Sequence, residues 1–406
     1  MRIGIVVQRY GQEITAGSEA YARTVARLLA EDHTVEVITT TALDYVTWRN
    51  ALPSGVDMDG RITVRRFPVD FERTGYWHEL HLLLLGGTDL PGFASLPAAR
   101  KRKLAERLNT WPLGLQEEFI KRQGPYSSSL LQWLSEHEQA YDAFIFCTHL
   151  YPTTYFGIEQ VARAKRYLLP TLHDEPAAYL PAYRRPFHHA QQILFLTAAE
   201  QELAARLVGA VKGYQLGYGI PIPPMAATSS EAEPYVLFGG RIDAIKGAEM
   251  LIDYFLRFRG RHPDLPVKLY LTGTQAMEIP SSPDIVYQGR VERDELYRLL
   301  RDARCFIHPS SYESLGIALL EAFAVGVPGL VNEASQVLAD HCRHSNGGLW
   351  FEGYEEFEAA LKTLLEQPEL RRELGRNGRT YVVEHFSLEA YQRRLRTLFP
   401  LPSGGA

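Results

Sequence analysis

The chain has 406 residues, of which 46% are hydrophobic and 22% charged, and a net charge of −5. These values are ordinary for a globular protein, and at about 150 residues per domain they predict two or three domains. The acidic balance argues against a nucleic-acid partner, and no apolar run reaches the roughly 18 residues of a membrane span. Since the three cysteines lie far apart and no signal peptide is recognisable, we expect a reduced, cytoplasmic protein.

Short apolar runs alternate with amphipathic stretches from the first residue onward. Residues 2–8 (RIGIVVQ) predict a strand, residues 18–31 a helix and residues 34–40 (TVEVITT) a second strand. This β-α-β alternation predicts a parallel sheet that is covered by helices. From about 71 to 135 the alternation stops, and we expect a helical insertion over the first sheet there.

The insertion contains two features that bear on partners. Its apolar run 80–87 (LHLLLLGG) is too short to span a membrane and fits a peripheral contact with a membrane surface. The basic cluster from Arg100 to Lys103 is interpreted as a solvated helix face, with a site for a phosphorylated or membrane-bound partner as the alternative.

The β-α alternation resumes after the insertion and starts again after a break. Strands are predicted at 143–149, 168–174, 192–198 and 211–217. The next segment, residues 220–234, is rich in Pro, Ser and Ala, a composition that is typical of a linker. We therefore expect an α/β fold of two doubly wound domains facing across a cleft. The expected parts are 1–219, the linker 220–234, a second domain over 235–386 and a C-terminal helical segment over 387–406 that crosses back to the first domain.

The first chemical signal is FGGRIDAIKG, residues 238–247. Gly240 lies at the end of a predicted strand, and two cations, Arg241 and Lys246, lie in the turn before the next helix. Glycine permits a close approach of the backbone to a ligand, and the two cations could hold a diphosphate. An ordinary turn with two solvated cations is the alternative for this motif taken alone.

The second signal is PSSYESLGIALLEAFAVGVP, residues 309–328. Glu313 follows a predicted strand, and Glu321 lies within an apolar helix that opens at Gly316. The free amides of a helix start favour phosphate oxygens, and a carboxylate can accept hydrogen bonds from two hydroxyls of a sugar or ribose. For Glu321 the alternative is a structural acid that is paired with a neighbouring arginine.

These motifs in this order resemble the retaining glycosyltransferases of the GT-B fold, family 4 group. The resemblance rests on Gly-Arg-x-x-x-x-Lys-Gly at 240–247, Pro-Ser-x-x-Glu-x-x-Gly-x-x-x-x-Glu-Ala at 309–322 and Gly-x-Pro at 326–328. Weaker similarity recurs at 16–40 and at 171–176 (TLHDEP). The resemblance implies a metal-independent enzyme without a cofactor. Such an enzyme moves a sugar from a nucleotide-diphosphate sugar to a carbohydrate or lipid-linked acceptor, as in polysaccharide or glycolipid biosynthesis.

The resemblance also implies roles for individual residues. Arg241 and Lys246 would bind the donor diphosphate, Glu313 the donor sugar and Glu321 the ribose. His173 matches a histidine near the donor sugar and completes the implied catalytic set with Glu313, Arg241 and Lys246. Further donor-binding positions are implied at Gly17, Gly240, Arg290, Val291, Leu315, Gly316 and Ile317.

The sequence departs from the family pattern in two places. Leu315 stands where the family has an aromatic residue, and the stretch after Pro328 lacks the usual Gly-Gly. Two rival functions are therefore kept. One is a nucleotide-sugar epimerase or hydrolase of the same fold, and the other is a non-catalytic nucleotide-sugar-binding partner.

Other polar motifs are given structural interpretations. The Asp-x-Asp motif at 57–59 is interpreted as a polar turn before Gly60, so no metal site is expected there. His149 ends a predicted strand and is interpreted equally as a lining residue or as a hydrogen-bonded strand-end histidine. The adjacent histidines 188 and 189 have a poor spacing for a metal.

Overall fold

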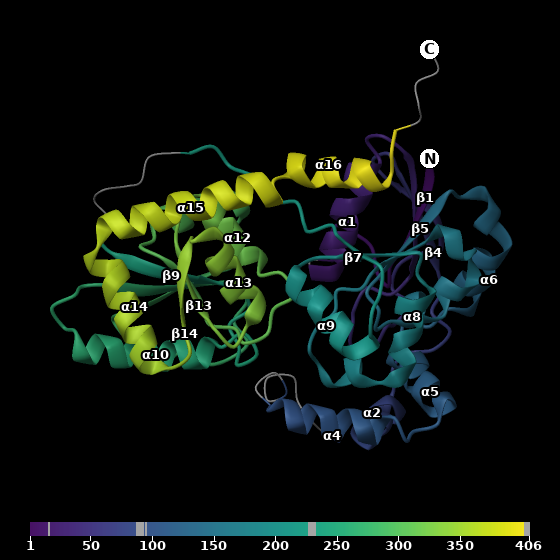
Figure 1. Ribbon diagram of the computed structural model, residues 1–406, viewed down its shortest axis with the longest axis horizontal. Helices are drawn as coiled ribbons and strands as arrows, with labels where there is room; N and C mark the ends of the chain where they lie inside the picture. Colours follow the sequence, from purple (N-terminus) through teal and green to yellow (C-terminus); the bar gives the residue numbers. More distant parts are fainter. Residues whose placement is uncertain (15–16, 87–92, 94–95, 226–232, 402–406) are drawn as a thin grey trace, which may run out of the picture. The chain divides into compact units, whose positions relative to one another are not determined.

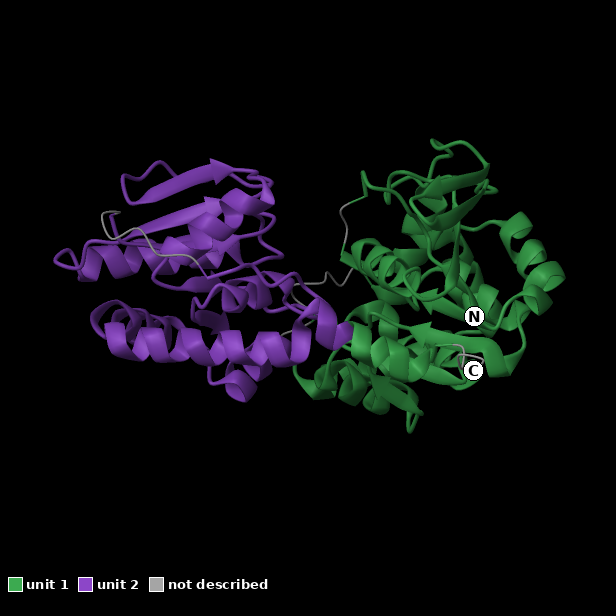
Figure 2. Ribbon diagram, turned by 90° about the horizontal axis from the view of Figure 1, so that it is seen from above, with its two compact units in different colours: residues 1–218, 392–406 green, residues 219–391 purple. Residues whose placement is uncertain are grey.

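The computed structural model describes residues 1–14, 17–86, 93, 96–225 and 233–401. The chain divides into two compact units, residues 1–218 with 392–406 (unit 1) and residues 219–391 (unit 2), which are coloured separately in Figure 2. Each unit has a largely or wholly parallel sheet with helical crossovers, so the prediction of two doubly wound α/β domains is confirmed.

Unit 1 is built on a sheet with the order β3-β4-β2-β1-β5-β6-β7-β8. The strands are β1 (Arg2–Val6), β2 (Thr34–Thr40), β3 (Gly55–Asp59), β4 (Ile62–Phe67), β5 (Ala143–Cys147), β6 (Arg166–Leu169), β7 (Gln192–Phe195) and β8 (Gly213–Gln215). The central strand β1 pairs in parallel with β2 on one side and β5 on the other, with Ile3 opposite Val35 and Ala143. Because β1 is flanked on both sides and is apolar after the exposed Arg2, residues Ile3 to Val6 are buried.

The helices of unit 1 are α1 (Gly17–Leu29), α2 (Gly75–Leu85), α4 (Ala98–Leu108), α5 (Leu113–Gln123), α6 (Ser128–His137), α7 (Pro152–Tyr155), α8 (Arg184–His189) and α9 (Ala198–Val208). Of these helices, α1, α6, α7, α8 and α9 contact the strands of the sheet, and α2, α4 and α5 lie away from it (Figure 1). The predicted insertion region contains α2, α4 and α5, which bury a separate apolar cluster around Leu84, Phe119 and Ile120. For the basic cluster from Arg100 to Lys103, the sequence pattern favours the interpretation as a solvated helix face. Lys101 departs from this interpretation, because its Nζ donates a hydrogen bond to Asp174 at 2.9 Å.

The four strands predicted between 143 and 217 extend beyond the strands observed, and one predicted turn is a strand. The strands predicted at 143–149 and 168–174 end earlier, because Thr148 and Thr171 take left-handed backbone conformations (φ 68° and 45°) that interrupt the extended chain. The motif Asp57–Asp59 is not a turn. It forms the edge strand β3, antiparallel to β4, because Gly60 (φ 62°) turns the chain back on itself.

Unit 2 has a parallel sheet with the order β11-β10-β9-β12-β13-β14. The strands are β9 (Tyr235–Gly239), β10 (Lys268–Thr272), β11 (Ile285–Gly289), β12 (Phe306–His308), β13 (Gly329–Asn332) and β14 (Gly348–Phe351). The helices are α10 (Ala248–Arg261), α11 (Arg293–Asp302), α12 (Ile317–Ala324), α13 (Gln336–Ser345), α14 (Tyr354–Glu366) and α15 (Pro368–Phe386). The sequence pattern did not predict β14. The four residues of β14 are too few to show the two-residue alternation of a strand in the sequence, and the strand is recognised by its pairing with β13.

The last helix, α16 (Leu388–Leu398), begins within unit 2 and ends within unit 1. In unit 1 its side chains are held by polar contacts: Arg396 pairs with Asp32 at 2.7 Å, and Arg394 donates to the carbonyl of Leu216 at 2.6 Å. The cysteines, Cys147, Cys305 and Cys342, are buried free thiols. No described helix is long and apolar enough to cross a membrane.

Each sheet has one point at which the direction of strand addition reverses. In unit 2 the chain runs outward from β9 through β10 to β11, and then returns to β12 on the other side of β9. In unit 1 the same reversal occurs between β1 and β5. Loops that leave the carboxyl ends of the two central strands diverge to opposite faces and leave room for a ligand there. These two places are where functional residues are to be sought.

One close approach in unit 2 gives a test of the packing. Helix α15 lies against the turn that ends α12, and a Cβ atom on Gly375 would be 2.0 Å from the carbonyl oxygen of Gly326. We expect Gly375→Ala to lower the free energy of unfolding by about 1–3 kcal/mol, because backbone must move. Gly260→Ala in α10 is the control: its Cβ meets no atom within 4 Å, so it should gain up to about 1 kcal/mol of helix propensity. Urea unfolding measures the free energy of unfolding of both variants. Equal values would contradict the close packing of Gly375 against Gly326.

Candidate functional site

The candidate residues of unit 2 lie on two loops that start side by side. β9 and β12 are hydrogen-bonded neighbours, with Phe306 opposite Leu237. The loop 240–247 follows β9 and carries Arg241 and Lys246, and the loop 309–316 follows β12 and carries Glu313. Motifs that are some 70 residues apart in sequence therefore meet at the point where the strand order reverses.

The two loops are joined by an ion pair. Nζ of Lys246 lies 2.5 Å from Oε1 of Glu313, and Nε2 of His308, the last residue of β12, lies 3.5 Å from the same oxygen. The carboxylate is largely buried, whereas the lysine is a third exposed. Burial lowers the pKa of His308, so this imidazole is neutral near pH 7. The sequence analysis missed His308, although a polar residue at the end of an apolar strand was a usable signal.

Asp243 organises the loop after β9. One of its oxygens accepts a hydrogen bond from the backbone amide of Lys246 at 2.8 Å, and the other is bonded by Nε of Arg241. The Arg241 side chain is 45% exposed, so its outer nitrogens remain accessible to a ligand. Gly240, which precedes Arg241, donates its amide to Thr272 of β10 at 2.9 Å and thereby fixes where the loop begins. Asp243 was not among the predicted residues.

Helix α12 begins with its amides at the same edge of the sheet. Gly316 precedes the helix with φ 71°, and a Cβ there would be 2.5 Å from Leu338, so glycine is required at this position. The buried Leu315 is anchored by its carbonyl, which accepts a hydrogen bond from Nε2 of His341 at 2.8 Å. The first backbone bonds of the helix come from Leu319, which leaves the amide of Ile317 available for an anion.

Glu321 lies in the interior of α12 and is nearly covered. Its Oε1 accepts a hydrogen bond from Arg293 at 3.2 Å, and the side chain of this arginine is 57% exposed. Burial raises the pKa of Glu321, and the attraction of Arg293 offsets this only in part. A pair with one exposed guanidinium compensates poorly for a buried carboxylate, so the structure leaves open both interpretations of Glu321, ligand and structural acid.

Arg290 and Val291 lie at the same edge but farther away. They follow β11, which is separated from β9 by β10. Arg290 is exposed, and among the described residues it forms no hydrogen bond or ion pair. The backbone is fixed just before this point, because Gly273 donates its amide to the carbonyl of Gly289 at 2.8 Å.

The two predicted residues of unit 1 lie at the carboxyl ends of its strands. Gly17 is the exposed first residue of α1, and His173 is a half-buried residue in the loop after β6. His149 is fully buried, and its Nδ1 is 3.0 Å from the carbonyl of Pro170. Burial lowers its pKa to about 4. The interpretation of His149 as a hydrogen-bonded strand-end histidine therefore fits the structure.

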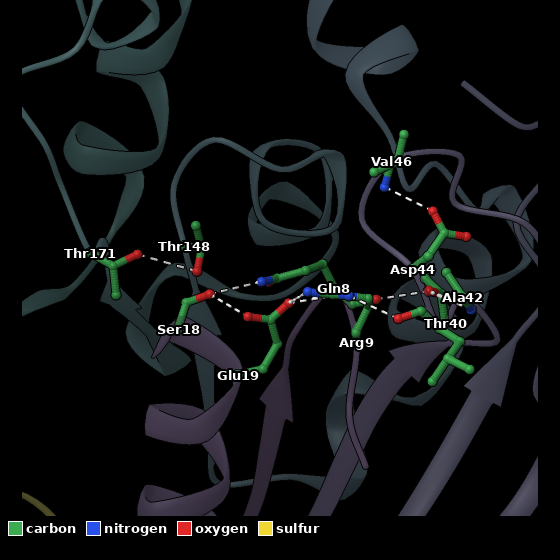
Figure 3. Close-up of polar contacts among 11 residues, drawn as sticks. Gln8, Arg9, Ser18, Glu19, Thr40, Ala42, Asp44, Val46, Thr148 and Thr171 are labelled. Atoms are coloured by element: carbon green, nitrogen blue, oxygen red, sulfur yellow. Dashed lines mark hydrogen bonds and ion pairs between the residues drawn. The ribbon is translucent and has the colours of Figure 1, made fainter. Parts of the chain in front are cut away.

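A buried polar network connects the end of β1 with the start of α1 (Figure 3). Nη2 of Arg9 lies 2.6 Å from Oε1 of Glu19, Ser18 donates to the other Glu19 oxygen at 2.6 Å, and Gln8 donates to Ser18 at 3.1 Å. The sequence analysis did not select these residues, because partners ten positions apart on a strand end and a helix start give no periodic signal. Among the residues that the structure describes, no group of three or more His, Cys, Asp or Glu could hold a metal ion.

Comparison with known proteins gives a family match for part of the chain. Residues 225–381 match the family model "Glycosyl transferases group 1". The putative glycosyltransferase YtcC of Bacillus subtilis is 24% identical over 205 residues, which is 46% of this chain and 48% of that protein. The match thus spans about half the length of this curated relative.

Two solved structures resemble the whole chain in fold. Sucrose-phosphate synthase from Thermosynechococcus elongatus superposes with a TM-score of 0.65 at 17% identity, covering 98% of both chains. Anabaena Alr3699/HepE, solved in complex with UDP and glucose, gives a TM-score of 0.64 at 14% identity and covers 98% of this chain and 99% of its own. The fold is therefore GT-B, and residues 225–381 match the model of the glycosyl transferases group 1 family.

Proposed function

We propose that the protein is a retaining, metal-independent glycosyltransferase that moves a sugar from a nucleotide-diphosphate sugar to a hydroxyl acceptor in polysaccharide or glycolipid biosynthesis. The observation that carries the proposal is the contact between Lys246 and Glu313 beside the start of α12, inside the region that matches the family. A cation, a carboxylate and free helix amides at one strand-order reversal suit a ligand that has both phosphates and hydroxyls.

In the proposed reaction the nucleoside diphosphate is the leaving group. Arg241, Lys246 and the amides at the start of α12 stabilise the negative charge that develops on it as the glycosidic bond breaks. Glu313 accepts hydrogen bonds from the donor sugar, and the ion pair with Lys246 holds this carboxylate in position. No side chain of this set is placed as a covalent nucleophile. We therefore propose that the acceptor oxygen attacks the anomeric carbon from the face that the diphosphate leaves. The new glycosidic bond forms as the bond to the phosphate oxygen breaks, and the acceptor proton passes to the departing phosphate. Attack from the same face retains the configuration.

The rival functions on the same fold differ in what they require. An epimerase or hydrolase would change the donor with no acceptor present, and a non-catalytic partner would bind the donor without turnover. A thermal-shift screen with UDP, GDP, ADP and their sugars tests the proposal first. A ligand at about 100 times its dissociation constant should add about 2.7 kcal/mol to the stability.

If no nucleotide or nucleotide sugar stabilises the protein, the proposal fails. With the donor identified, transfer should persist in EDTA, because two cationic side chains take the place of a metal. Activity that is lost in EDTA and restored by Mg²⁺ or Mn²⁺ would contradict metal independence.

The two cations should be needed for turnover. Arg241→Ala or Lys246→Ala removes a charge-assisted contact to the leaving group, and each should lower kcat by roughly ten- to a hundredfold. Arg298→Ala is a matched control, because this arginine is also exposed and paired with a neighbouring carboxylate on its own helix. Initial rates at saturating donor decide the question. Wild-type rates for both Arg241→Ala and Lys246→Ala would show that the diphosphate binds elsewhere.

The two acids should give different phenotypes. Glu321→Gln should weaken both the free nucleoside diphosphate and the donor, because it is proposed to bind the ribose. Glu313→Gln should lower turnover but leave the free nucleoside diphosphate bound as before, since Lys246 keeps its charge and loses only a competing partner. Calorimetry with nucleoside diphosphate and with donor measures both.

The alternative for Glu321 has its own signature. If Glu321→Gln binds the nucleotide normally and only lowers the melting temperature, Glu321 is a structural acid. In that case Arg293→Ala, which removes the partner of Glu321, should lower the melting temperature as well.

A further inference from the structure

Unit 1 buries several carboxyl groups, and almost all of them have clear partners. Glu36 accepts hydrogen bonds from Arg2, Arg65 and Tyr141, and Glu19 is paired with Arg9. Glu200 accepts one backbone amide on each oxygen, from Leu172 and Leu196, both at 2.6 Å. Each of these groups is compensated as a buried acid must be, and each ties two segments of the fold together.

Glu175 differs from these residues. Its Oε1 is shielded from solvent and has no hydrogen-bond partner, and no hydrogen bond or ion pair joins its carboxyl to another described residue. The adjacent Asp174 is satisfied, because Lys101 and Tyr179 donate to it at 2.9 and 2.8 Å. Burial and the like charge of Asp174 raise the pKa of Glu175 to about 8, so the side chain is a neutral acid near pH 7.

The location of Glu175 is a ligand-binding edge. It lies in the loop after β6, two residues beyond His173, at the carboxyl edge next to the reversal between β1 and β5. Tyr151, which follows β5, is within electrostatic range of Glu175 and of Arg9, Glu19 and Arg73. The loops after β1, β5 and β6 therefore converge near this carboxyl. Glu175 as a whole residue is partly exposed, although its Oε1 is shielded from solvent.

The surroundings favour a neutral, hydroxyl-bearing ligand over a cation. Arg73 already lies near Tyr151, where its guanidinium donates to the carbonyl of Gln123, and its charge disfavours a further cation. Among the described residues no set of ligands for a metal is formed there. A neutral carboxyl both donates and accepts a hydrogen bond, which matches a hydroxyl group that does the same.

We propose that Glu175 is a binding residue for a hydroxyl group of the acceptor, which is a sugar or a cyclitol. This inference rests on the proposed function and adds an acceptor-specific residue to it. The unpaired acid is kept at a cost in stability because the bound hydroxyl satisfies it, as occurs at sites where function and stability conflict.

The experiment compares Glu175→Leu with Glu200→Leu, a matched control at another buried glutamate of the same unit. Glu175→Leu removes an unpaired acid, so its melting temperature should equal or exceed that of the wild type. Glu200→Leu leaves the amides of Leu172 and Leu196 without an acceptor, so its melting temperature should be below that of the wild type. If Glu175→Leu destabilises the protein as much as Glu200→Leu, Glu175 is structural and the proposal is overturned.

Binding provides the functional readout. The probes are D-glucose, D-fructose, myo-inositol and their monophosphates, titrated with and without the nucleoside diphosphate found by the thermal-shift screen. For each probe that binds the wild type, Glu175→Leu should raise the dissociation constant about ten- to a hundredfold. Glu175→Gln, which keeps one donor and one acceptor, should stay within about threefold. Binding of the nucleoside diphosphate should be the same in the wild type, Glu175→Leu and Glu175→Gln.

The outcomes separate this inference from the proposed function. Unchanged probe binding in Glu175→Leu, or no binding of any probe to the wild type up to about 100 mM, overturns the inference while the nucleotide site stands. Absence of nucleotide binding in the wild type refutes the proposed function, and loss of probe binding in Glu175→Leu would then still support a hydroxyl site at Glu175.

Discussion

The parallel pairing of β9 with β12 is the contact on which the candidate site of unit 2 depends. Hydrogen bonds between these strands make two loops start side by side, although the intervening chain forms β10, β11 and two helices. Because strand order reverses between β9 and β12, these loops leave room for a ligand between them. Lys246 and Glu313 can form an ion pair only because the sheet has this order.

The loops themselves are ordered by polar groups that the ligand would not replace. Asp243 bonds the amide of Lys246 and the guanidinium of Arg241, and His341 holds the carbonyl of Leu315 before α12 begins. These partners restrict the positions of the proposed phosphate-binding groups before a ligand arrives. Such preorganisation lowers the entropic cost of binding and favours a transition state with a defined charge distribution.

Unit 1 uses buried charge in a different way. Most of its buried carboxyls join segments: Glu19 ties the end of β1 to α1, and Glu200 ties the ends of β6 and β7 to α9. Against this background a carboxyl that joins nothing is informative, because burial without a partner is unfavourable. Glu175 is such a group, and the contrast with Glu200 in the same unit is the reason to interpret it as a ligand residue.

The sequence by itself determined the two doubly wound domains and the loops that carry the motifs. The spacing of apolar residues and the positions of turn residues are local properties, so they can be recognised without knowing which strands are neighbours. It also indicated the glycosyltransferase family, through the spacing of Arg241, Lys246, Glu313 and Glu321. It did not determine where β5 and β6 end, the strand at Asp57–Asp59, the role of Asp243 and His308, or which buried acids lack partners. Only the tertiary structure decided these, because hydrogen-bond partners and burial depend on residues tens of positions away in the sequence. Such residues become neighbours through the order of the strands, which the local sequence pattern does not contain.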